Sequence, residues 1–70
     1  MKQVWYYEKE NKNATLGFKT QDTITQILKD LKANNCVLVA IYNYETDIIK
    51  VYSDRKDYRV MADYEWKANL

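Results

Sequence analysis

The side chains that could do chemistry are few among the 70 residues of this chain. Histidine is absent, which removes the most common general base, metal ligand and proton shuttle of proteins. The single cysteine, Cys36, therefore has no imidazole to activate it as a nucleophile, and it begins the most apolar run of the chain. We expect Cys36 to be a small buried apolar residue that forms no disulfide.

Three pairs of carboxylates are close enough in sequence to be considered as catalytic or metal-binding groups: Glu8 with Glu10, Glu45 with Asp47, and Asp54 with Asp57. The first two pairs flank predicted hairpin tips and the third lies in a predicted turn, where carboxylates are ordinary solvated residues. A phosphate-binding loop is excluded because the chain has a single glycine. The sequence therefore predicts a protein that is not an enzyme and that holds no metal and no cofactor.

Charge and hydropathy narrow the class of partner. The eleven basic and ten acidic residues give a net charge of +1, whereas proteins that neutralise many phosphates usually carry a clear basic excess. The N-terminus lacks the apolar stretch of a signal peptide. The longest apolar run, residues 36–42, is far shorter than the roughly 20 residues that span a bilayer. We expect a cytoplasmic protein that does not associate with membranes.

The clearest predicted element is one amphipathic helix. Its apolar stripe has helical spacing and consists of Ile24, Ile27, Leu28 and Leu31. Thr23, with Gln26 three residues later, has the spacing of a capping box. Asn34 and Asn35 can end the helix, because asparagine tolerates the left-handed conformation found there. These signals predict a helix over about 22–34.

A β-hairpin is predicted before the helix, with strands over 4–9 and 14–19 and a polar turn over 10–13. A tip at Asn11 and Lys12 gives one coherent apolar face, on which Trp5 faces Phe18 and Tyr7 faces Leu16. We expect this face of the hairpin to contact the helix.

A central strand over 36–42, apolar on both faces, and a second hairpin strand over 48–53 are predicted after the helix. A three-residue loop would place Val39 and Ile41 beside Ile49 and Val51, and a two-residue loop gives another acceptable face. Residues 58–66 alternate apolar and polar side chains, which favours a further strand over a helix.

Together these elements predict a single α+β domain over residues 1–70. The expected architecture is an antiparallel sheet of four to five strands with one helix packed on one face, in the order ββαβββ. The first five elements resemble the β-grasp order of ubiquitin-like folds and immunoglobulin-binding bacterial domains. This resemblance concerns topology alone and implies no function.

The function predicted from this architecture is protein–protein interaction. One helix covers one face of a sheet, so the reverse face is expected to expose apolar and aromatic side chains that bind another protein or a second copy. The expected contact residues are Tyr6, Tyr42, Tyr44 and Tyr52, with Lys50 and Arg59 at the rim. Such a protein would act as a homodimer or as an accessory or inhibitory protein on a larger target, of the kind that phages and mobile elements encode.

Two alternatives stay open at this point. The tail could fold over the reverse face and complete a single core, which would leave no exposed patch. The aromatic side chains could also stack the bases of a single-stranded nucleic acid, with phosphates held by basic residues. The basic residues in that case would be Lys9, Lys12, Lys19, Lys50, Lys56 and Arg59.

Overall fold

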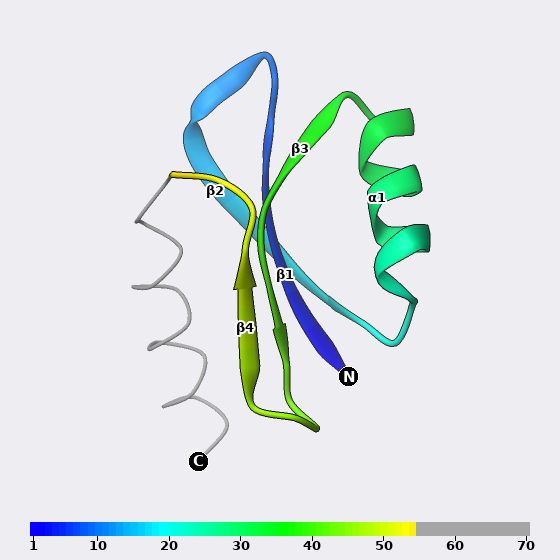
Figure 1. Cartoon of the computed structure of the whole chain (residues 1–70). Coiled ribbons are helices and arrows are strands. Elements are labelled where there is room, and N and C mark those ends of the chain that lie inside the picture. The colour runs from blue at the N-terminus through cyan, green and yellow to red at the C-terminus, as the bar shows by residue number, and fades with distance from the viewer. Residues whose placement is uncertain (55–70) are drawn as a thin grey trace.

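The computed structural model of the protein describes residues 1–54 (Figure 1). Its elements in chain order are β1 (Lys2–Glu8), β2 (Asn11–Thr20), α1 (Ile24–Ala33), β3 (Cys36–Asn43) and β4 (Ile48–Val51). The four strands form one sheet in the order β2-β1-β3-β4, and every neighbouring pair is antiparallel. This arrangement confirms the predicted α+β class. The strand predicted over 58–66 lies outside the described residues.

The agreement with the β-grasp order is limited to the succession of elements along the chain. The two central strands, β1 and β3, are antiparallel in this sheet, whereas a β-grasp sheet has a parallel pair at its centre. The resemblance therefore does not extend to how the strands are paired.

Helix α1 begins and ends where the capping signals predict. The Thr23 side-chain oxygen accepts a hydrogen bond of 3.2 Å from the Gln26 backbone N–H, which satisfies one of the free donors of the first turn. The Gln26 side chain donates to Asp30 one turn later and does not complete the capping box. At the other end Asn34 is the C-cap and Asn35 takes a left-handed conformation with φ of 58°.

The register of the β1–β2 hairpin differs by one residue from the prediction. The observed pairs on the helix side of the sheet are Val4 with Phe18 and Tyr6 with Leu16. Trp5 lies opposite Gly17, so Trp5 and Tyr7 belong to the reverse side of the sheet, which faces away from α1. The prediction that Trp5 and Tyr7 contact the helix is wrong, because a one-residue shift moves every side chain of a strand to the other face.

Both the position of the turn and an irregularity in the pairing beyond it contribute to this shift. Residues 9 and 10 form the turn, and Asn11 already pairs with Glu8 at the start of β2. The register then changes between Tyr6 and Glu8, where β2 has four residues (12–15) opposite the single residue Tyr7 of β1. The extra residues therefore lie on β2, and the polar sequence of residues 10–13 does not reveal them.

Strand β3 runs through the centre of the sheet and carries the core on both of its faces, as predicted. A β-bulge opposite Trp5 places both Val39 and Ala40 on the reverse side, while Leu38 and Ile41 point towards the helix. Residues 38–42 of this strand are all buried.

The helix-side core is built from α1, β1 and β3, and its buried members are Val4, Ile27, Leu31, Leu38 and Ile41. Ile24, Tyr6 and Cys36 pack against this cluster and are half-buried. Leu28, the remaining residue of the predicted apolar stripe, is 44% exposed. Of the four strands, β3 makes the most extensive contact with α1, so only the Ile27 and Leu31 edge of the stripe is fully covered.

The reverse side of the sheet has a second buried cluster, which consists of Trp5, Val39, Ala40 and Tyr42, with Tyr7 and Tyr44 packed against it. We name this set the reverse cluster. The ring of Tyr44 stands edge-on to Tyr42 at 4.9 Å between centroids. The reverse face was predicted to be an open apolar patch. This is wrong for the centre of the face, because Trp5, Val39, Ala40 and Tyr42 are buried there.

The β3–β4 hairpin has a four-residue turn over 44–47, one residue longer than the preferred prediction. Ile49 is consequently opposite Tyr42 and Val51 is opposite Ala40, both on the reverse side. Lys50 is opposite Ile41 and belongs to the helix side.

Candidate protein-binding edge

Strand β4 lies at one edge of the described sheet (Figure 1). All four of its residues are exposed, and three of them are apolar: Ile48 at 62%, Ile49 at 42% and Val51 at 48% exposure. An edge strand with exposed apolar side chains is a template for pairing with another strand.

The backbone of β4 has a defined outward edge. The Tyr52 N–H donates to the Val39 carbonyl at 2.8 Å, which fixes the phase of the hydrogen bonds between β3 and β4. Because these bonds alternate along an antiparallel pair, the N–H and C=O groups of Lys50 face β3. Those of Ile49 and Val51 therefore point away from β3, towards the place where an added strand would lie.

The other edge of the described sheet, β2, is protected in the usual way. It is ten residues long and presents Lys12, Lys19 and two asparagines along its length. Charged and polar side chains of this kind discourage edge-to-edge pairing. The single charged residue of β4 is Lys50, so charged side chains oppose pairing with another strand less at this edge than at β2.

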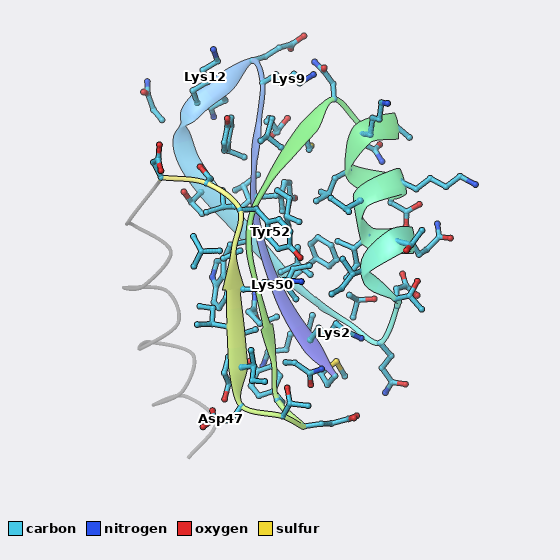
Figure 2. The ribbon with its side chains drawn as sticks, viewed as in Figure 1. Lys2, Lys9, Lys12, Asp47, Lys50 and Tyr52 are labelled. Atoms are coloured by element: carbon cyan, nitrogen blue, oxygen red, sulfur yellow. The ribbon has the colours of Figure 1, made fainter. Side chains whose placement is uncertain are left out.

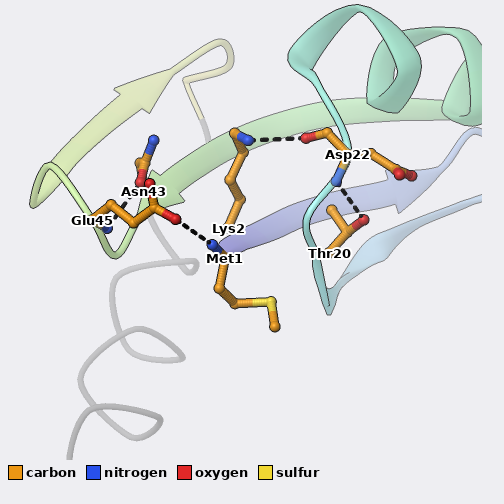
Figure 3. A network of polar contacts seen from close by, with 6 residues as sticks. All are labelled: Met1, Lys2, Thr20, Asp22, Asn43 and Glu45. Carbon is orange, nitrogen blue, oxygen red and sulfur yellow. Dashed lines mark hydrogen bonds and ion pairs between the residues drawn. The ribbon is translucent and has the colours of Figure 1, made fainter.

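The turn that leads into β4 is tightly held. Asp47 takes a left-handed conformation with φ of 56°, and its N–H donates to the Asn43 carbonyl at 2.9 Å. The Asn43 side chain accepts from the Glu45 N–H at 2.9 Å (Figure 3). Asparagine and aspartate suit these positions because their side chains cap turns and tolerate positive φ.

The N-terminus adds a second anchor to the same turn. The Met1 ammonium lies 3.4 Å from the Glu45 carboxylate (Figure 3). The Tyr44 N–H donates to the Met1 carbonyl at 3.2 Å. The Lys2 ammonium donates to the Asp22 carbonyl at 2.9 Å and so links β1 to the start of the helix. These contacts fix the start of β4 relative to the sheet.

Tyr42 connects the turn to the reverse cluster. Its hydroxyl donates to the Asp47 carboxylate from a side chain that is almost fully buried. Burial, the hydrogen bond to Asp47 and the negative charge of that carboxylate raise the pKa of Tyr42 from 10.0 to about 12. Tyr42 is therefore a neutral structural group at physiological pH.

A hollow of about 480 Å³ borders β4 beyond its last residue. Tyr7 and Val37 line it from the reverse side of the sheet, and Val51, Tyr52 and Ser53 line it from the end of β4. Tyr52 is 40% exposed, so its ring is accessible at the mouth of this hollow.

The predicted contact residues do not lie together on one surface of the structure. Tyr6 lies on the helix side against the core and contacts the Phe18 ring, so its predicted place on the reverse face is wrong. Tyr42 is buried and Tyr44 is half-buried in the reverse cluster. Tyr52 and Lys50 lie at β4, and Arg59 lies outside the described residues.

Ile48, Ile49 and Val51 were not predicted from the sequence as contact residues. A further strand was predicted over 58–66, after this hairpin, so nothing in the sequence marked residues 48–51 as an edge strand. The three-residue loop placed Ile49 and Val51 beside Val39 and Ile41, whereas the two-residue alternative corresponds to the observed face, on which they lie beside Tyr42 and Ala40.

The labelled lysines of Figure 2 do not form one basic surface. Lys9 and Lys12 lie at the β1–β2 turn, whereas Lys2 is at the opposite end of the sheet (Figure 2). Lys19 lies over the Tyr44 ring at 5.7 Å from its centroid. Within residues 1–54, no group of three or more cysteine and acidic side chains is placed to hold a metal ion.

None of the helices in the described part of the chain has the length and apolar character needed to cross a membrane. No protein family model matches the chain, and searches of curated proteins and of solved structures also return no match.

Proposed function

We propose that this protein is a small non-catalytic protein–protein interaction module whose interface is the β4 edge. The observation that carries the proposal is the exposure of Ile48, Ile49 and Val51 on a strand with an outward-facing backbone. A partner strand that adds to β4 would gain main-chain hydrogen bonds and would cover these side chains. The partner is a second copy of the chain or a larger target on which the protein acts as an accessory or inhibitor.

The homodimer is the form we favour, because β4 is complementary to itself in one register. Antiparallel pairing centred on Ile49 makes a hydrogen-bonded pair of the two outward-facing Ile49 residues. In this register Lys50 lies opposite Ile48 of the second copy, and Val51 lies opposite Asp47. Pairing centred on Lys50 would place two ammonium groups directly opposite each other, which destabilises a sheet.

Sedimentation equilibrium of the purified chain tests this proposal. We expect a concentration-dependent dimer that Ile49→Lys weakens by at least tenfold, since the two lysines would lie directly opposite each other on the same face of the extended sheet. Leu28→Lys is the matched control, because Leu28 has a similar exposure of 44% but lies on α1. Equal effects of the two substitutions, or a monomer over the whole concentration range, would contradict the homodimer.

Single-stranded nucleic-acid binding is the competing proposal, and the geometry gives it less support. It requires exposed rings gathered on one sheet face, whereas Tyr6 and Tyr42 lie on opposite sides of the sheet and Tyr42 is buried. A fluorescence anisotropy titration with a labelled oligonucleotide at two salt concentrations distinguishes the proposals. Binding that weakens steeply with salt would favour nucleic acid.

A further inference from the structure

A groove separates the C-terminal half of α1 from the β1–β2 hairpin. It has a volume of about 410 Å³, and among its lining residues are Tyr6, Phe18, Leu31, Cys36, Glu8 and Asp30. The groove exists because α1 lies mainly over β3 and leaves the helix side of β1 and β2 only partly covered. We name it the α1 groove. Its volume is within the range of about 300–1,000 Å³ that is usual for ligand sites.

The floor of the α1 groove is aromatic. The rings of Tyr6 and Phe18 meet edge to face, with centroids 5.6 Å apart and an angle of 66° between their planes. Phe18 is 36% exposed, and the Tyr6 side chain is half-buried. Such a floor accepts an aliphatic or planar group and attracts a cation to the ring faces.

The rim of the α1 groove is acidic. Glu8 and Asp30 are exposed, and neither carboxylate pairs with a lysine within the part of the chain that the structure describes. The Asp30 carboxylate accepts one hydrogen bond, of 2.8 Å, from the Gln26 side chain and keeps further lone pairs for a ligand. The chain is nearly neutral overall, so this pair of carboxylates beside an aromatic floor is a local feature.

We propose that the α1 groove binds an arginine-bearing peptide segment of a protein partner. The guanidinium is planar and can stack on aromatic rings while it donates several hydrogen bonds to carboxylates. The apolar stem of arginine would lie along the Tyr6 and Phe18 floor, with its charged tip at Glu8 and Asp30. This groove is on the helix side near β2, so the inference stands independently of the β4 interface.

The test is a two-dimensional ¹H–¹⁵N NMR titration of the full chain with the peptide acetyl-Leu-Arg-Leu-amide. The matched control peptide carries citrulline in place of arginine, which keeps the shape and removes the charge. We expect shifts at the groove residues and at least a fivefold tighter Kd for the arginine peptide. Equal Kd values, or no shift at about 5 mM peptide, would overturn the proposal.

Three variants locate the binding. Glu8→Gln and Asp30→Asn keep the shape of the rim, and each should weaken the arginine peptide about two- to fivefold, as expected for exposed ion pairs. Asp22→Asn removes an exposed carboxylate before the helix and should change nothing. Saturable binding that neither rim variant alters would refute the site. Groove shifts that depend on protein concentration without peptide would identify a second copy as the occupant and would also refute it.

Discussion

Replacing Val39 by alanine removes two methyl groups from the centre of the reverse cluster, where Val39 is 0% exposed. At about 0.8 kcal/mol for each buried carbon, the lost burial alone lowers the free energy of unfolding by about 1.6 kcal/mol. The cavity that is left brings the expected loss to about 2–3 kcal/mol. A chain of this size has a total stability of about 3–10 kcal/mol, so this single substitution is a large perturbation.

Val51→Ala is the matched control, because Val51 has the same side chain on the same side of the sheet but is 48% exposed at the edge. Both substitutions exchange a strongly β-forming residue for alanine, and this common effect cancels in the comparison. We expect Val51→Ala to lower the free energy of unfolding by less than about 1 kcal/mol.

Urea unfolding followed by far-ultraviolet circular dichroism gives both values under the same conditions. Dilute protein keeps any association through β4 from contributing to the comparison. The difference of at least about 1 kcal/mol should also appear as a melting temperature that is lower by about 4–8 °C for Val39→Ala. Equal losses for the two variants would refute the conclusion that the reverse side has a buried core.

The remaining predictions concern the polar contacts that shape the fold. The pKa of Tyr42 is raised from 10.0 to about 12, so its contribution to the free energy of unfolding is present below pH 10 and is lost as the pH rises through about 12. In urea unfolding at high pH, Tyr42→Phe should abolish this pH-dependent loss of stability. Asn35→Gly should leave the melting temperature nearly unchanged, whereas Asn35→Val should lower stability by about 1–2 kcal/mol, because φ of 58° suits glycine and opposes a β-branched residue. Thr23→Ala should lower the free energy of unfolding by about 1 kcal/mol through loss of the N-cap, and Thr23→Ser should restore most of it.

Local signals in the sequence predicted the helix and the central strand well. The helix was recognised from the spacing of Ile27 and Leu31, and its ends from Thr23 and Asn35, because capping depends on residues that are neighbours in the chain. Strand β3 was recognised because residues buried on both faces form a continuous apolar run.

The faces of the hairpins could not be predicted in the same way. The choice between Val4 with Tyr6 and Trp5 with Tyr7 as the helix-facing pair depends on the register of β1 with β2, which the extra residues of β2 beside the turn help to set, and both sets are apolar. The bulge opposite Trp5 and the four-residue turn before Ile48 each shift a register by one residue. Such irregularities follow from tertiary packing and leave no mark on hydrophobic periodicity.

The predicted position of the candidate interface differs from the one proposed from the structure for the same reason. Because a single helix covers only one face of a sheet, the binding surface was predicted in the middle of the reverse face, where Tyr42 was expected to be exposed. In the structure the residues at that centre are buried, and the exposed apolar side chains are those of Ile48, Ile49 and Val51 on β4. Only Tyr52 and Lys50 of the predicted contact residues lie beside this edge.

Amide hydrogen exchange of β4, measured by NMR at two protein concentrations, tests pairing through this edge most directly. The Lys50 amide, which faces β3, should be protected at both concentrations. The Ile49 and Val51 amides should exchange rapidly in dilute protein and become protected as the concentration rises. Rapid exchange of both at every concentration would contradict pairing between copies, and protection already complete in the dilute monomer would show that the edge is occupied within one chain.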